Sequence, residues 1–356
     1  MTVRLPATMQ VFERGWLSSN NILFTGSDTA LVDSGYVTHA PQTLALVRHA
    51  LGGRPLDRLL NTHLHSDHCG GNAALQAEYG CRTAIPAAEA AKVAAWDEDA
   101  LSYRATGQQC PRFGADGVLA PGDALELGGM RWEVLGAPGH DPHALLLFCP
   151  DEGILISGDA LWENGFGVIF PELAGEPGFD EARATLDLIG TLDARLVVPG
   201  HGRMFTDVPG ALARAYSRLD YLSADPRRNA ENAVKVLVKF LLLERQRIAL
   251  AELPGLLASI PVVAAALELL GRVGGEPASR GPAHPTGLRS HIDGDTRTGS
   301  HALQRRVDGS SVHAFNAHPH TDTPPNAAWH DLATWATHSL VRAKAARIDG
   351  AFLVDA

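Results

Sequence analysis

The sequence has few cysteines and few aromatic residues, and it has no long apolar run. Its four cysteines among 356 residues form no CxxC pair and no framework spacing, so we expect reduced thiols in a cytoplasm. The longest apolar runs, such as the LLL at 241–243, are far too short to span a bilayer. The first 21 residues also lack the apolar core of a signal peptide. These absences predict a soluble cytoplasmic protein with no membrane partner.

A surplus of basic charge is missing as well. The chain has 30 Lys and Arg against 40 Asp and Glu, a net charge of −10. The charge is uneven, because residues 226–356 carry about +3 and residues 1–225 about −13. An acidic surface repels polyanions, so nucleic acid is not expected as the main substrate unless metal ions reverse the local field.

Length and an apolar fraction of 45% predict about two domains with a sizeable core. The first domain, predicted over 1–225, alternates short apolar strands with helices. Several strands end in a His or an Asp within a glycine-containing turn, which is where rigid scaffolds mount their chemistry. Strands are predicted at 9–13, 21–26, 29–35, 56–63, 131–138, 144–150, 153–159 and 195–202, and helices at 40–53, from about 71, and at 179–190.

The stretch NTHLHSDHCGG at 61–71 crowds three histidines and an aspartate into six positions. His63 and His65 alternate along an extended segment and so point the same way, whereas Asp67 and His68 lie past a bend. The motif therefore offers two pairs of ligands to two neighbouring points. Imidazole with carboxylate suits zinc, iron or manganese, and a site without thiolate keeps positions for water.

Two metal ions need further ligands, and later strand ends supply them. GAPGHDPH contains His140, LISGDALW contains Asp159, and VVPGHG contains His201. Together with LVDSG at 31–35, five motifs follow in order. This series resembles the metallo-β-lactamase fold family over roughly residues 10–205.

The resemblance implies an α+β fold, the four-layer αββα sandwich, with the site at one edge between the sheets. It implies a first metal on His63, His65 and His140, a second on Asp67, His68 and His201, and Asp159 as the bridge. Asp33 matches an aspartate that orients the ligands, although it could also only cap a turn. Because Asp159 stands where true lactamases commonly have a cysteine, the chain resembles the glyoxalase II-like branch.

Two divalent ions, most simply Zn²⁺ with Fe or Mn as alternatives, can share a water and lower its pKa towards 7. Asp67 would orient this nucleophile as the catalytic residue. We expect hydrolysis of an ester, thioester or lactone of a small molecule. A phosphodiesterase or nuclease, or a metal-binding regulatory protein, are the alternatives, although Arg82, Arg104 and Arg112 are too scattered to support the nuclease.

Trp162, Phe166 and Phe170 follow Asp159 and could either line an apolar substrate pocket or close the core. His143 is expected in the loop around the site rather than as a ligand, and 94–109 could form a helical lid that carries Trp96 and Tyr103. A glutathione carrier would need a cationic patch, for which the candidates are Lys235, Lys239, Arg245 and Arg247.

The second domain, predicted over 226–356, is mainly helical. Residues 272–328 are rich in Gly, Pro, Ser, Thr and His, which predicts a disordered insertion or an altered reading frame. A helix and a hairpin turned at Asp349 and Gly350 follow. The helices and hairpin resemble the small winged-helix-like domain of some hydrolases of this family. The net charge of residues 226–356, about +3, is too small to favour DNA binding. We therefore expect this domain to pack beside the substrate or to form a homodimer.

Overall fold

The structure is a computed structural model that describes residues 4–271 and 326–356. The first sheet has six strands in the order β1-β2-β3-β4-β5-β6. Its first three strands pair antiparallel and the pairs from β3 to β6 are parallel. The strands are β1 Met9–Phe12, β2 Asn21–Thr25, β3 Thr29–Val32, β4 Arg58–Leu60, β5 Arg82–Pro86 and β6 Gly117–Leu119.

The second sheet has five strands in the order β11-β10-β9-β8-β7. All its pairs are antiparallel except β10 with β11. Because β10 and β11 are parallel, their carboxyl ends meet at the same edge of the sheet. The strands are β7 Ala124–Leu127, β8 Met130–Gly136, β9 Leu145–Cys149, β10 Ile154–Gly158 and β11 Leu196–Pro199.

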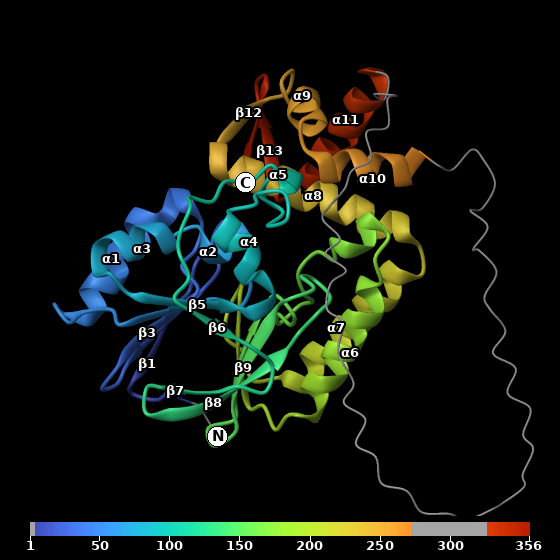
Figure 1. The fold of residues 1–356 in the computed structure, drawn as a ribbon. Coiled ribbons are helices and arrows are strands. Elements are labelled where there is room, and N and C mark those ends of the chain that lie inside the picture. The colour runs from blue at the N-terminus through green and yellow to red at the C-terminus, as the bar shows by residue number, and fades with distance from the viewer. Residues whose placement is uncertain (1–3, 272–325) are drawn as a thin grey trace, which may run out of the picture.

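The two sheets pack face to face, and helices cover their outer faces (Figure 1). The core between the sheets includes Phe24 and Trp132, whose rings meet edge to face at 5.4 Å. The helices α1 Ala40–Leu51 and α3 Asn72–Tyr79 bury their apolar residues against the first sheet, and α6 Gly178–Thr191 and α7 Val208–Ser223 against the second. The predicted αββα order is confirmed. A strand buried on both faces is largely apolar; β9 is apolar throughout, and β10 has one polar residue, Ser157, whose hydroxyl donates to the carbonyl of Leu161.

Shorter elements complete this part of the chain. They are the helices α2 Ser66–Cys69, α4 Ala90–Ala95 and α5 Tyr103–Thr106, and the 3₁₀ turns η1 Val37–His39, η2 Ala87–Glu89 and η3 Pro171–Ala174. Sequence patterns predict neither β5, β6 nor β7. Each has five residues or fewer, and β6 and β7 are largely exposed, so they have no apolar run.

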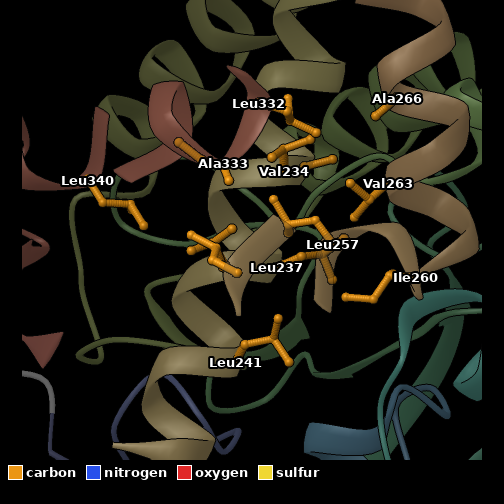
Figure 2. Packing of buried hydrophobic residues seen from close by; sticks show 14 of the residues in the cluster. Val234, Leu237, Leu241, Leu257, Ile260, Val263, Ala266, Leu332, Ala333 and Leu340 are labelled. Carbon is orange, nitrogen blue, oxygen red and sulfur yellow. The ribbon is translucent and has the colours of Figure 1, made fainter. Parts of the chain in front are cut away.

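The C-terminal part packs around a hydrophobic core that also includes Val168 and Leu173 of the sandwich part, and Figure 2 shows this core between α8, α9, α10 and α11. The elements are α8 Pro226–Arg245, β12 Arg247–Ala249, α9 Leu253–Ala258, α10 Pro261–Gly271, α11 Asn326–Arg342, β13 Ala346–Asp349 and β14 Phe352–Asp355. The strands form a small sheet in the order β12-β14-β13. The winged-helix-like assignment and the domain boundary at 225 stay predictions.

The predicted insertion at 272–328 lies mostly outside the described residues. Its last three residues are an exception, because α11 begins at Asn326. The boundary of the insertion is therefore wrong at this end. Ala327 and Ala328 are strong helix formers that continue directly into the buried Trp329.

The C-terminal part contacts the sandwich on the side where the histidine motif lies. Tyr36 is fully buried, its ring meets that of Phe240 in α8, and its hydroxyl donates to Glu244 at 2.9 Å. Gly107, just after α5, lies so close to Ile260 that a methyl group there would contact Ile260 Cγ1 at 2.9 Å. Within the described part of the chain, no helix has the length and apolar character to cross a membrane.

Candidate metal centre

The predicted ligands converge at one edge of the sandwich, although they come from segments far apart in the sequence. His63 and His65 follow β4, Asp67 and His68 lie in α2, and His140 lies in the loop between β8 and β9. Asp159 follows β10 directly, and His201 comes just after β11. The strands fix the backbone at each ligand, so the fold sets the geometry of the site.

The first group consists of His63, His65 and His140, whose ligand nitrogens lie within 4.8 Å of one another. His65 Nδ1 and His140 Nε2 are only 2.8 Å apart. Burial, together with His68 and His65, holds the pKa of His63 well below its ordinary value, and burial with His65 lowers the pKa of His140 to about 4. These imidazoles are therefore neutral at neutral pH, as ligands must be.

The outer contacts of the first group show which nitrogens carry protons. His140 Nδ1 lies in hydrogen-bond contact with the carbonyl of Val168 and so donates, which leaves a lone pair on Nε2. His65 Nε2 lies 3.6 Å from Asp141 Oδ2, which favours the proton on that nitrogen and a lone pair on Nδ1. Two lone pairs then face each other at 2.8 Å. That arrangement is repulsive unless a cation lies beside both nitrogens.

The second group consists of Asp67, His68 and His201. His201 Nε2 lies 3.0 Å from Asp67 Oδ2. His68 is completely buried, and its Nδ1 lies 2.8 Å from Asp33 Oδ2. Burial opposes a charge on His68, but Asp159 and Asp33 outweigh it and raise its pKa well above the ordinary value. A metal ion at Nε2 would supply the positive charge that this carboxylate-rich setting favours.

Asp159 lies between the two groups. Its Oδ1 is 3.3 Å from His68 Nε2, and its Oδ2 is 3.4 Å from His140 Nε2 and 3.8 Å from His201 Nε2. Burial raises the pKa of this carboxyl group, but His201 and His68 more than offset that effect and hold it well below the ordinary value. One ionised carboxylate thus reaches both groups, as a bridging ligand would.

A buried nitrogen of the first group also fits a bound cation. Nε2 of His63 is buried and has no hydrogen-bond partner. A buried polar atom without a partner is costly, so such an atom needs an explanation. His63 belongs to the first group, and a metal ion held there would satisfy this nitrogen.

Asp33 lies beneath the histidine motif, where the resemblance placed it. It accepts hydrogen bonds from the amide and the hydroxyl of Thr62 at 2.9 and 2.8 Å, in addition to its contact with His68. Its φ of 59° is unusual for a residue other than glycine, so these contacts hold the backbone in a strained conformation. The carboxylate fixes the His68 ring with Nε2 towards the site, which agrees with an orienting role and not with a turn cap alone.

The three aromatic candidates have three different environments. Phe170 lines a cavity of about 450 Å³ beside His65 and His140. Phe166 is 4% exposed and packs in the core under α6 and α7, which agrees with the alternative that it closes the core. Trp162 lies on the His201 side, where its Nε1 donates to Asp159 Oδ1 at 3.3 Å.

Two residues at the site were missed by sequence reasoning. Trp16 is 57% exposed and stacks on His201 with an interplanar angle of 7°, and its ring also meets that of Trp162. It lies in a loop before β2 with no motif around it. Asp141 could have been found, because it follows His140 directly in the quoted motif.

The predicted lid at 94–109 is only partly helical. Tyr103 is buried against Cys69 Sγ, and Trp96 packs on Phe113, so neither aromatic ring faces the site. Residues from this segment nevertheless line the cavity, among them Leu101 and Thr106. His143 also lines it and contacts Glu89, as expected for a residue outside the ligand set.

None of the four residues predicted for a cationic patch lines the cavity, Arg245 included. Lys239 Nζ is bonded to Asp355 and to the carbonyl of Ala345 within the C-terminal part. Lys235 lies over the ring of Trp335, and Arg247 lies over that of Phe352. These cations therefore hold the C-terminal elements together, and none of them lines the cavity.

Comparisons with known proteins agree with the fold. The model of the Metallo-beta-lactamase superfamily matches residues 14–201, which is more than half of the chain, so the chain belongs to this superfamily. The hydroxyacylglutathione hydrolase of Acidiphilium cryptum (strain JF-5) is 33% identical over 178 residues, or 49% of this chain and 60% of that protein. The protein of the same name from Anaeromyxobacter dehalogenans (strain 2CP-C) is 33% identical over 207 residues, or 57% of this chain and 69% of that protein.

Among solved structures, a beta-lactamase domain protein from Burkholderia ambifaria is similar, with a TM-score of 0.52 and 21% sequence identity. The similarity covers 77% of this chain and 92% of that one. At this identity it shows the fold alone. The aligned share exceeds what the sandwich up to residue 225 could supply, so the likeness extends into the C-terminal part.

Proposed function

We propose that the protein is a dinuclear metal-dependent hydrolase that cleaves an ester, thioester or lactone of a small molecule. The observation that carries this proposal is the position of Asp159, within 3.3–3.8 Å of nitrogens from both groups. The relatives named above as hydroxyacylglutathione hydrolases favour a thioester. Their alignments cover only part of their length, so the substrate of this chain rests on its own site.

The chain's residues have distinct parts in this proposal. One cation would be held by His63, His65 and His140. The other would be held by Asp67, His68 and His201, and Asp159 would contribute to the binding of both. Two bound divalent cations, most simply Zn²⁺, would lower the pKa of a shared water towards 7 and polarise the scissile carbonyl. Asp67 has an oxygen 3.0 Å from His201 and is partly accessible, so it could also orient the attacking water and accept its proton.

The environment of the site also favours an acyl substrate over a phosphodiester. A phosphodiester carries a negative charge that unpaired arginines or lysines would stabilise. Lys92 is the one lysine or arginine among the residues that line the cavity, and it is bonded to Glu89 at 2.9 Å. A neutral carbonyl compound needs no such partner.

The test is hydrolysis of an acyl thioester and of an aryl phosphodiester by the metal-loaded full chain, beside Asp159→Ala. We expect thioester turnover that is lost in the variant. Turnover of the phosphodiester alone would replace the proposal with a phosphodiesterase. Silence on both substrates by a protein that binds metal would favour a regulatory metal-binding protein instead.

A further inference from the structure

We infer that the cavity beside the first ligand group is a subsite for an uncharged, apolar acyl group, and that it excludes acyl groups with a terminal carboxylate. This inference rests on the proposed function and narrows its substrate class. The cavity adjoins His65 and His140, so a group bound there would place a neighbouring carbonyl at the ligand nitrogens. Its volume of about 450 Å³ is in the range of small-molecule sites.

The walls of the cavity are mostly apolar and come from both parts of the chain. Leu64, Leu101 and Phe170 belong to the sandwich, and Val262 belongs to α10. The packing of Ile260 against Gly107 holds α10 at this position. Apolar surface removed from water stabilises a complex in proportion to its area, so longer acyl chains should bind better here.

The charged groups of the cavity decide what it refuses. Glu89 is 4% exposed and contacts the two basic side chains at the cavity, Lys92 and His143. Both basic groups are therefore already paired with one buried carboxylate. Asp141 and Glu176 are two further carboxylates at the wall.

Apart from the cation that His65 and His140 would hold, a substrate carboxylate would consequently meet like charge and no unpaired cation among the residues that line the cavity. Repulsion from an uncompensated carboxylate at a partly buried position is weakly screened. The carrier of a thioester is commonly large and polar, whereas its acyl group can be wholly uncharged. The acyl group is thus the part of the substrate that matches this cavity.

The experiment compares thioesters of one neutral carrier, N-acetylcysteamine, that differ only in the acyl group: acetyl, octanoyl and succinyl. For the metal-loaded full chain we expect kcat/KM for octanoyl to exceed that for acetyl at least about tenfold, because several methylenes become buried. We expect succinyl to be cleaved more slowly than acetyl. Equal rates on all three, or a preference for succinyl, would overturn the inference.

Two neighbouring alanines provide a matched pair of variants. Ala88 lines the cavity and Ala87 does not, and both are exposed in the same 3₁₀ turn, η2. Ala88→Trp should fill the cavity and bring the octanoyl-to-acetyl ratio close to one, whereas Ala87→Trp should keep the wild-type ratio. An unchanged ratio in Ala88→Trp would refute the subsite.

A charge variant tests the exclusion separately. Glu176 is exposed at the rim, so Glu176→Lys should fold and should raise kcat/KM for succinyl relative to acetyl severalfold. Glu152→Lys makes the same charge change in the exposed turn before β10, at the opposite end of that strand from Asp159, and should leave the ratio unchanged. A succinyl-to-acetyl ratio that does not respond to Glu176→Lys would contradict the exclusion.

Binding distinguishes failure of the subsite from failure of the proposed function. The thioether N-acetyl-S-octylcysteamine cannot be hydrolysed, and calorimetry with the metal-loaded protein measures its affinity. Binding that Ala88→Trp abolishes, in a protein that cleaves no thioester, would support the subsite and refute the function. Thioester turnover without such binding would support the proposed function and refute the subsite.

Discussion

Gly200 allows the sharpest test of how the fold shapes the metal centre. A methyl group on Gly200 would lie 2.2 Å from Asp159 Oδ1 and 2.8 Å from His68 Cε1. The glycine cannot retreat, because its amide donates to Gly158 at 2.7 Å and its carbonyl accepts from the amide of Asn20 at 2.6 Å. In Gly200→Ala the carboxylate of Asp159 must therefore move away from the added methyl group. The distance between the methyl carbon and Oδ1 has to grow from 2.2 Å to at least 3.0 Å, because real Cβ atoms essentially never have closer contacts.

The size of that displacement sets the expected loss. A misplacement of about 1 Å at a catalytic group can lower activity about 10²-fold, so for a shift from 2.2 to 3.0 Å we expect a loss of up to about that size in kcat/KM for Gly200→Ala. We also expect reduced metal content, because Asp159 is the residue shared by both groups. Overpacking costs about 1–3 kcal/mol, which the fold should survive, and circular dichroism checks this.

Gly114→Ala is the control, since no heavy atom lies within 4 Å of its added methyl group. It should retain the wild-type rate and metal content. Inductively coupled plasma mass spectrometry and thioester hydrolysis measure the two quantities. A Gly200→Ala protein with full metal content and wild-type kcat/KM would show that Asp159 is not held where the structure places it.

Three further predictions follow from the surroundings of the site. Asp33→Asn should weaken metal affinity about 10–100-fold by releasing the His68 ring, and unchanged affinity in a chelator competition would refute the orienting role. Tyr36→Phe should lower the free energy of unfolding by about 1–2 kcal/mol, because the hydrogen bond to Glu244 is lost. An unchanged midpoint in a denaturant titration would contradict this prediction. Burial lowers the pKa of His140 from 6.5 to about 4. As the pH falls, the imidazole is therefore protonated in the unfolded chain before it is protonated in the folded one. The metal-free protein should lose stability as the pH falls from about 6.5 towards 4. His140→Gln should weaken that dependence, and an identical pH dependence of unfolding in both proteins would count against it.

The ligands of the metal centre could be predicted because they are local features of the chain. His140, Asp159 and His201 each follow an apolar strand and lie next to a glycine, and the order of the motifs restricts which fold can join them to the 61–71 motif. The structure brings His63, His140 and Asp159 together although up to 96 positions separate them in the sequence. No single motif predicts that these residues lie close together, but the ordered series of motifs does.

The substrate side could not be predicted in the same way. Trp16 lies in a loop, Phe170 directly before the turn η3, and Val262 in a C-terminal helix, and no periodic pattern connects these segments. Phe166 and Phe170 are only four positions apart, yet the first packs in the core and the second lines the cavity. Lys239 shows the same limit, because a lysine on a helix does not reveal that Asp355 will pair with it.

The measurement that tests the dinuclear centre most directly is the number of metal ions bound per chain. Full-length protein loaded with Zn²⁺ and freed of excess ion should contain two ions by mass spectrometry, and Asp159→Ala should hold fewer. Two ions in the wild type and a loss in the variant are the result that we predict. A wild-type chain that holds none, or an Asp159→Ala chain that still holds two, would contradict a centre built around this bridging carboxylate.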